Sequence, residues 1–132
     1  MCSSDLEVAR IDSRVKAVAF FDTYFQAAHL LLEHGLQKPL LYGYSTSAGG
    51  YLGVFNQATQ DAIAYQITNT RHGDFSDVGT WVDRADDSGR RAGAAILDCM
   101  RSFLTKHLKG DDDHFLDNPT AKYPEIVKFQ KK

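Results

Sequence analysis

The strongest constraint on the fold is a nearly continuous apolar run, Val15–Phe21, that ends at an aspartate. A run without polar alternation is typical of a strand covered on both faces, as in a parallel sheet. Two more short apolar stretches follow, Pro39–Tyr44 and Ala62–Thr68. The second is rich in residues that favour strands, and the first begins with a proline where a strand tolerates one. The sequence therefore predicts three strands.

Segments of helical character separate and follow these strands. Ala27–His34 predicts a short helix closed by Gly35, and Tyr51–Thr59 is weakly helical. Arg90–Lys109 is the clearest helix, because its apolar residues recur every three or four positions. Alternation of strands and helices is typical of a parallel sheet with right-handed crossovers. The predicted class is α/β, with about three parallel strands and flanking helices.

The chain divides into three predicted segments: an N-terminal extension over 1–11, a domain over 12–118 and a C-terminal tail over 119–132. Cys2–Leu6 resembles the translated end of a common sequencing adapter. On that interpretation the natural chain begins upstream of Met1. The alternative is an ordinary polar N-terminus.

Composition excludes several kinds of partner. The 132 residues are 43% hydrophobic and carry a formal net charge of −2. This length suits one folded domain, and the charge lacks the basic excess that nucleic acid would require. Every apolar run falls short of the roughly 20 residues that span a bilayer. Cys2 and Cys99 form no recognisable disulfide framework, and we expect Cys99 to be buried on a helix.

The sequence predicts no cofactor and no metal site. His29 and His34 are five residues apart, so on one helix their side chains would diverge by about 140°. They do not form the His-Glu-x-x-His motif of zinc enzymes. Ala48–Gly50 is not followed by the Lys-Ser or Lys-Thr pair of a phosphate-binding loop.

Two polar residues follow predicted strands: Asp22 directly, and His72 after a short polar turn. Carboxyl ends of parallel strands share one edge, where active sites of open α/β folds form, so we expect the two side chains to lie close together. Histidine exchanges protons near neutral pH, and an aspartate can hold its ring in one tautomer. The pair therefore suggests the acid and base of a nucleophilic hydrolase. The structural alternatives are a helix N-cap for Asp22 and a loop histidine that only bonds its surroundings for His72.

Arg14–Asp22 resembles the strand and catalytic acid of the platelet-activating-factor acetylhydrolase family and of related dienelactone hydrolase-like and cutinase-like esterases. The stretches that resemble the next strand, the histidine loop and the closing helix of these enzymes are Lys38–Tyr42, Ile67–Asp77 and Ala95–Gly110. The resemblance covers roughly Asp12–Asp111. It implies the C-terminal part of an α/β-hydrolase fold, with Asp22 as catalytic acid and His72 as catalytic base.

The nucleophile elbow of that fold, Gly-x-Ser-x-Gly, does not occur in the sequence. In the family it precedes the acid, so we expect it, and the oxyanion hole, at or before Met1. Ser45 and Ser47 in the loop Ser45–Gly50 are alternative nucleophiles, but each lacks one flanking glycine. They also lie between the predicted acid and base, whereas the family order is serine, acid, base.

Two functions remain open on sequence alone. The first is a C-terminal fragment of a serine carboxylic-ester hydrolase, esterase-like or lipase-like, that supplies the acid and base but not the nucleophile. Its partners would be a small ester substrate and the N-terminal part of the same domain, and the chain alone would be inactive. The second is a non-catalytic, flavodoxin-like module for binding or interaction. A Gly-x-Ser-x-Gly encoded upstream of Met1 would favour the first.

Overall fold

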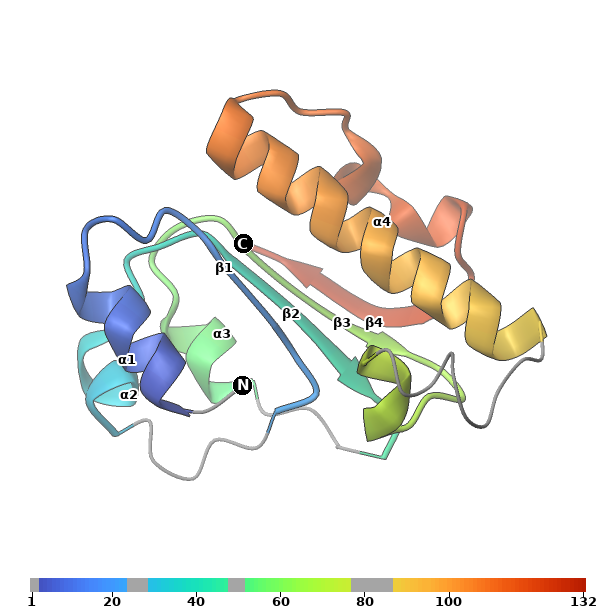
Figure 1. Cartoon of the computed structure of the whole chain (residues 1–132), viewed down its shortest axis with the longest axis horizontal. Helices are drawn as coiled ribbons and strands as arrows, with labels where there is room; N and C mark the ends of the chain where they lie inside the picture. Colours follow the sequence, from blue (N-terminus) through green and yellow to red (C-terminus); the bar gives the residue numbers. More distant parts are fainter. Residues whose placement is uncertain (1–2, 24–28, 48–51, 77–86) are drawn as a thin grey trace.

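The computed structural model describes residues 3–23, 29–47, 52–76 and 87–132. Within them, one four-stranded sheet has the strand order β1-β2-β3-β4 (Figure 1). The strands are β1 (Val18–Phe21), β2 (Leu40–Ser45), β3 (Ala62–Ile67) and β4 (Ile126–Lys131). The first three run parallel, and β4 pairs antiparallel with β3. The predicted α/β class with three parallel strands is confirmed.

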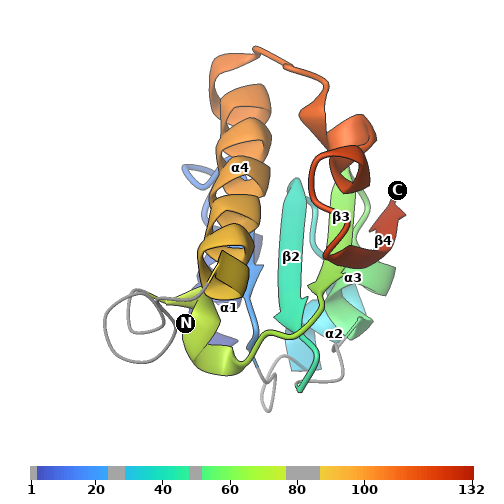
Figure 2. The same cartoon turned by 90° about the vertical axis from the view of Figure 1, so that its right-hand side faces the viewer.

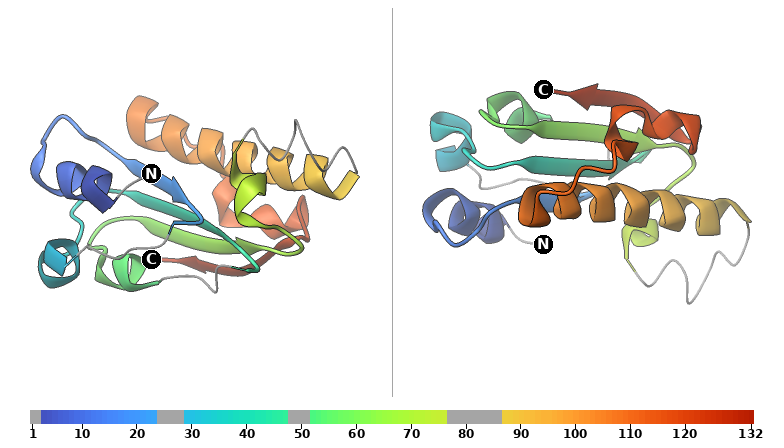
Figure 3. Two further views of the ribbon diagram at one scale, coloured as in Figure 1. Left: turned by 60° about the horizontal axis from the view of Figure 1, so that its bottom comes forward. Right: turned by 90° about the horizontal axis from the view of Figure 1, so that it is seen from above.

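Helices cover both faces of this sheet (Figure 2). The described helices are α1 (Ser3–Ile11), α2 (His29–His34), α3 (Gly53–Gln57) and α4 (Asp87–Lys109). The first three pack on one face, and α4 lies lengthwise along the strands on the other (Figure 3). Cover on both faces is what a parallel sheet requires.

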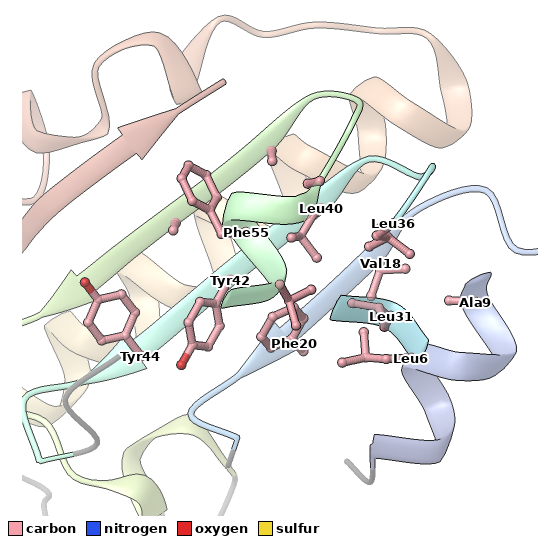
Figure 4. Close-up of a cluster of buried hydrophobic side chains, with 14 residues drawn as sticks. Leu6, Ala9, Val18, Phe20, Leu31, Leu36, Leu40, Tyr42, Tyr44 and Phe55 are labelled. Carbon is pink, nitrogen blue, oxygen red and sulfur yellow. The ribbon is translucent and has the colours of Figure 1, made fainter. Parts of the chain in front are cut away.

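The central strand β2 is buried along its whole length, and its side chains alternate between two cores. Leu40, Tyr42 and Tyr44 face the side of α1 to α3 (Figure 4). There the rings of Phe20 and Tyr42 stack with centroids 4.4 Å apart. Leu41 faces α4. This two-sided burial explains why the strands appear in the sequence as apolar runs without alternation.

Four strand boundaries differ from the sequence prediction, two of them because β2 begins at Leu40, not Pro39, and β3 ends at Ile67, not Thr68. Val15 begins the first apolar run, but its N–H donates to the carbonyl of Asp12 in a turn, so it does not enter the sheet. The ladder starts where the Val18 N–H donates to the carbonyl of Pro39, at 2.9 Å. At the other end, Ser45 was predicted to begin a loop and is instead the last residue of β2.

Helices α2 and α4 end where predicted, at His34 and Lys109, whereas α3 ends at Gln57, two residues before the predicted Thr59. Gly35 ends α2 with a φ of 71°, and its N–H donates to the Leu31 carbonyl at 2.9 Å, as the predicted glycine closure requires. Helix α4 starts at Asp87, three residues before the predicted Arg90. Several predicted positions lie outside the described residues: Cys2, Ala27, Tyr51, the loop at 48–50 and the irregular segment at 77–86.

The segment predicted as a tail over 119–132 contributes a strand that the sequence analysis did not predict. Strand β4 pairs Ile126 with Ile67 and Lys131 with Ile63. Its register shifts once, at a bulge where Lys128 has a φ of 48°. Lysines and a bulge are typical of an edge strand protected against further pairing. In β4 these features also interrupt the alternation of apolar and polar residues by which a strand is recognised in a sequence.

The segment predicted as an extension over 1–11 contains α1. Its Leu6 and Ala9 are buried in the same core cluster as Leu31 of α2, while Val8 and Ile11 are exposed. The carboxylate of Glu7 on α1 accepts the Leu31 N–H in the first turn of α2 at 3.0 Å. A carboxylate at a helix N-terminus satisfies an unpaired donor and favours the helix dipole. Helix α1 therefore contributes to both packing and capping.

No described helix is both long enough and apolar enough to cross a bilayer.

Two glycine-to-alanine substitutions test the packing between the sheet and α4. A Cβ on Gly43 would lie 2.8 Å from Phe21 Cδ1 and 3.0 Å from Tyr65 Cζ, whereas one on Gly93 of α4 meets nothing within 4 Å. Gly43→Ala should lower the free energy of unfolding by about 1–3 kcal/mol. Gly93→Ala should raise it by up to about 1 kcal/mol, because alanine favours a helix. Urea unfolding measures both, and equal effects would contradict this packing.

Candidate active site

Asp22 and His72 lie at the carboxyl edge of the parallel strands. Asp22 directly follows β1, and its N–H donates to the Gly43 carbonyl of β2 at 2.8 Å. His72 opens the one-turn 3-10 helix η1 (His72–Phe75), which lies beside the strand ends (Figure 1). The structure therefore brings together two residues that are fifty positions apart in the sequence.

The two side chains form a direct contact. His72 Nδ1 lies 3.0 Å from Asp22 Oδ2. The Asp22 side chain is 1% exposed and the His72 side chain is 73% exposed. An ionised carboxylate only accepts hydrogen bonds, so with such a partner this geometry favours the neutral tautomer that has its proton on Nδ1. Nε2 then carries a lone pair and can take a proton from a hydroxyl group.

The Asp22 carboxylate is anchored from its other oxygen. The backbone N–H of Ser45 donates to Oδ1 at 2.6 Å in a buried hydrogen bond. Asp22 itself has a φ of 46°, in the left-handed region that aspartate visits more readily than most residues. Such a conformation costs on the order of 1–3 kcal/mol and persists where the surroundings impose it. Here the strand end and the Ser45 amide impose it.

The loop that carries His72 is braced by its own hydrogen bonds. The Thr70 hydroxyl donates to the Ile67 carbonyl at 2.6 Å, at the end of β3. Asp74 Oδ2 accepts the Arg71 N–H at 2.8 Å across the start of η1. Phe75 of η1 also packs against the sheet, with the centroid of its ring 6.0 Å from that of the Phe21 ring. These contacts orient η1 and the histidine on it.

Ser45 and Ser47, the alternative nucleophiles, have different surroundings. Ser45 is completely buried, and its hydroxyl lies 2.9 Å from that of Ser47. Its carbonyl accepts a hydrogen bond from Gln66 Nε2 at 3.3 Å. Ser47 is exposed. Sequence reasoning did not identify Ser45 as the anchor of Asp22 or Gln66 as a neighbour of the site, because both roles depend on strand register.

Cys99 does not provide a reactive thiol. It is fully buried on α4, as predicted. Burial raises the pKa of its thiol to about 12. A thiol acts as a nucleophile in its deprotonated form, so a pKa this high disfavours nucleophilic chemistry.

The described residues include no group of three or more His, Cys, Asp or Glu side chains that could bind a metal ion.

An apolar groove of about 260 Å³ lies between η1 and α4. One wall is formed by Phe21, Asp74, Phe75 and Ser76, and the other by the α4 residues Gly93, Ile96, Leu97 and Met100. Phe21 directly precedes Asp22, and Phe75 shares η1 with His72. The groove is therefore lined by residues that lie next to Asp22 in the sequence and in the same short helix as His72.

Comparisons with known proteins support an esterase-like fold. No family model matches the chain, and no curated protein matches it. Among solved structures, the chain is similar to a ferulic acid esterase from Streptomyces cinnamoneus, with a TM-score of 0.75 and 25% sequence identity. The match covers 97% of this chain and 43% of the esterase. The chain thus has an α/β, esterase-like fold and spans less than half the length of that enzyme. The comparison does not choose among the three esterase families named above.

The anchoring of Asp22 can be tested by stability. Asp22→Ala removes the acceptor of a buried N–H and places alanine at positive φ, so it should lower the free energy of unfolding by about 2–4 kcal/mol. Asp22→Asn keeps an oxygen for the Ser45 N–H and tolerates this backbone, so its loss should be clearly smaller. Urea unfolding of both variants measures the difference. Equal losses would show that the Ser45 hydrogen bond contributes little.

Proposed function

We propose that this chain is the C-terminal part of a serine carboxylic-ester hydrolase and that it supplies the catalytic acid, Asp22, and the catalytic base, His72. The nucleophile would come from polypeptide that precedes the chain in the same domain. The observation that carries the proposal is the contact of 3.0 Å between His72 Nδ1 and a buried Asp22 carboxylate at the carboxyl edge of the sheet. The match to 43% of an esterase supports it further.

The proposed reaction is acyl transfer through a serine ester. The serine oxygen attacks the ester carbonyl carbon while His72 Nε2 takes its proton, and Asp22 stabilises the imidazolium. The tetrahedral intermediate then expels the alcohol, which receives that proton from His72. Water attacks the acyl-serine with the same base, releasing the carboxylic acid and restoring the serine.

The surroundings of Ser45 and Ser47, the two alternative nucleophiles, support a nucleophile elsewhere. A substrate cannot reach the hydroxyl of Ser45, which is completely buried. Ser47 is exposed, but neither serine has the paired glycines that the strained turn of a nucleophile elbow requires. An oxyanion hole in this fold uses the N–H after the nucleophile and an N–H from an earlier loop. We propose that both donors also precede this chain.

The substrate class we propose is a small carboxylic ester. The similar solved structure is a ferulic acid esterase, so ferulate esters are the first natural-type substrates to test beside short p-nitrophenyl esters. Nothing in the comparisons favours the flavodoxin-like binding module over an esterase.

The chain alone should not hydrolyse esters, because on this proposal the attacking serine and the oxyanion hole precede it. The test is to incubate the purified chain with a fluorophosphonate probe and with p-nitrophenyl acetate. We expect no labelled serine and no turnover above that of a His72→Ala variant. Labelling of Ser45 or Ser47, with turnover that His72→Ala abolishes, would overturn the assignment of the nucleophile.

In the longer polypeptide that we propose, we expect a Gly-x-Ser-x-Gly serine that the fluorophosphonate labels. His72→Ala there should lower kcat on the order of 10⁴-fold or more. The matched control is His114→Ala, because His114 Nδ1 also lies near an aspartate, 3.1 Å from Asp117 Oδ2, on an exposed surface. The control should leave kcat unchanged. Equal kcat for the His72 variant and the control would show that His72 is not the catalytic base.

A further inference from the structure

The buried side-chain amide of Gln66 donates a hydrogen bond to Ser45, the residue whose N–H holds the Asp22 carboxylate. Gln66 on β3 is 5% exposed, on the strand face that also carries the buried Ala62 and Ala64. It is the register partner of Tyr44 on β2. A primary amide in such apolar surroundings destabilises the fold unless it is hydrogen-bonded. A buried glutamine near the end of a strand is therefore expected to have a specific hydrogen-bond partner.

The partner of Gln66 is the residue that holds the acid. Gln66 Nε2 donates to the Ser45 carbonyl at 3.3 Å. The Ser45 N–H donates to Asp22 Oδ1 at 2.6 Å, and Asp22 Oδ2 lies 3.0 Å from His72 Nδ1. A continuous series of three hydrogen bonds thus joins the interior of the sheet to the exposed histidine.

Ser45 needs this support because it is the last residue of β2, where the ladder to β3 ends. A hydrogen bond to its carbonyl and another from its N–H restrain the backbone on both sides of its Cα. Its N–H must stay aimed at Asp22, whose backbone is held in the left-handed region. Loss of the carbonyl contact would let the strand end rotate and lengthen the bond to the carboxylate.

We infer that Gln66 is a positioning residue for the acid–base pair: through Ser45 it fixes the Asp22 carboxylate, and through Asp22 it fixes the proton of the neutral His72 ring on Nδ1. The inference rests on the proposed function for its catalytic meaning. The positioning itself can be measured without activity.

The variant that tests it is Gln66→Met, which keeps the length of the side chain and removes the donor. The matched control is Thr46→Val. The Thr46 hydroxyl donates to the Ile67 carbonyl at 3.3 Å, so it also links the ends of β2 and β3, but it bonds neither Asp22 nor the Ser45 carbonyl. Gln66→Leu is a second variant with a different shape, and Asp22→Ala is the reference for a lost anchor.

The readout is the tautomer of His72, measured by ¹H–¹⁵N correlation of its ring at about pH 9, where an ordinary imidazole is neutral. In the unaltered chain Nδ1 should carry the proton, and in Asp22→Ala the balance should shift to Nε2. Gln66→Met should lower the ratio of Nδ1–H to Nε2–H roughly threefold, the scale of one modest hydrogen bond. Thr46→Val should leave the ratio unchanged.

The outcomes separate the two proposals. A ratio altered by Asp22→Ala but not by either Gln66 variant overturns the positioning role and leaves the proposed acid and base intact. A ratio that Asp22→Ala does not alter contradicts the pairing on which the proposed function depends. Loss of the fold in both Gln66 variants would show that Gln66 acts through the core as a whole, which overturns the inference. In the longer enzyme, Gln66→Met should lower kcat and leave KM unchanged.

Discussion

The rest of the structure depends on the pairing of β2 with a parallel strand on each side. Such a strand is stable only when both of its faces are dry, because each face must pack against another layer. Within β2 this leaves no solvent-facing position for a polar side chain before the ladder ends, at Ser45. Polar side chains are therefore concentrated at the carboxyl edge of the sheet, where Asp22 contacts both Ser45 and His72.

At that edge the fold combines backbone strain with a strong hydrogen bond. The left-handed conformation of Asp22 directs its carboxylate back over the end of β2 instead of along β1. A hydrogen bond to an ionised acceptor is stronger than one between neutral groups, and the Ser45 N–H lies 2.6 Å from Asp22 Oδ1. The bond offsets part of the strain and leaves the second carboxylate oxygen for His72. In the proposed reaction, a side chain held this way would need no reorganisation when the histidine takes a proton.

The sequence predicted the parts of this arrangement that depend on local pattern. Apolar runs marked three strands, and the polar residues that follow two of them were Asp22 and His72. It did not predict β4, because an edge strand with lysines and a bulge lacks the alternation of a half-buried strand. It also missed Ser45 and Gln66 as supports of the site. Their roles follow from the register of β2 against β1 and β3, which no single run of residues encodes.

A comparison within the molecule shows why distance alone does not define such a pair. His114 Nδ1 lies 3.1 Å from Asp117 Oδ2, almost the same as in the Asp22–His72 contact. Asp117, however, is 55% exposed and also bonds Lys131, which lowers the pKa of its carboxyl more than His114 does. Solvent screening and the competing Lys131 cation weaken the attraction between the Asp117 carboxylate and the His114 imidazole. Asp22 is 1% exposed, so solvent screens its electrostatic interaction with His72 far less than it screens that of Asp117 with His114. Burial of the acid, more than proximity to it, is what would let Asp22 stabilise a positive charge on His72 in the proposed reaction.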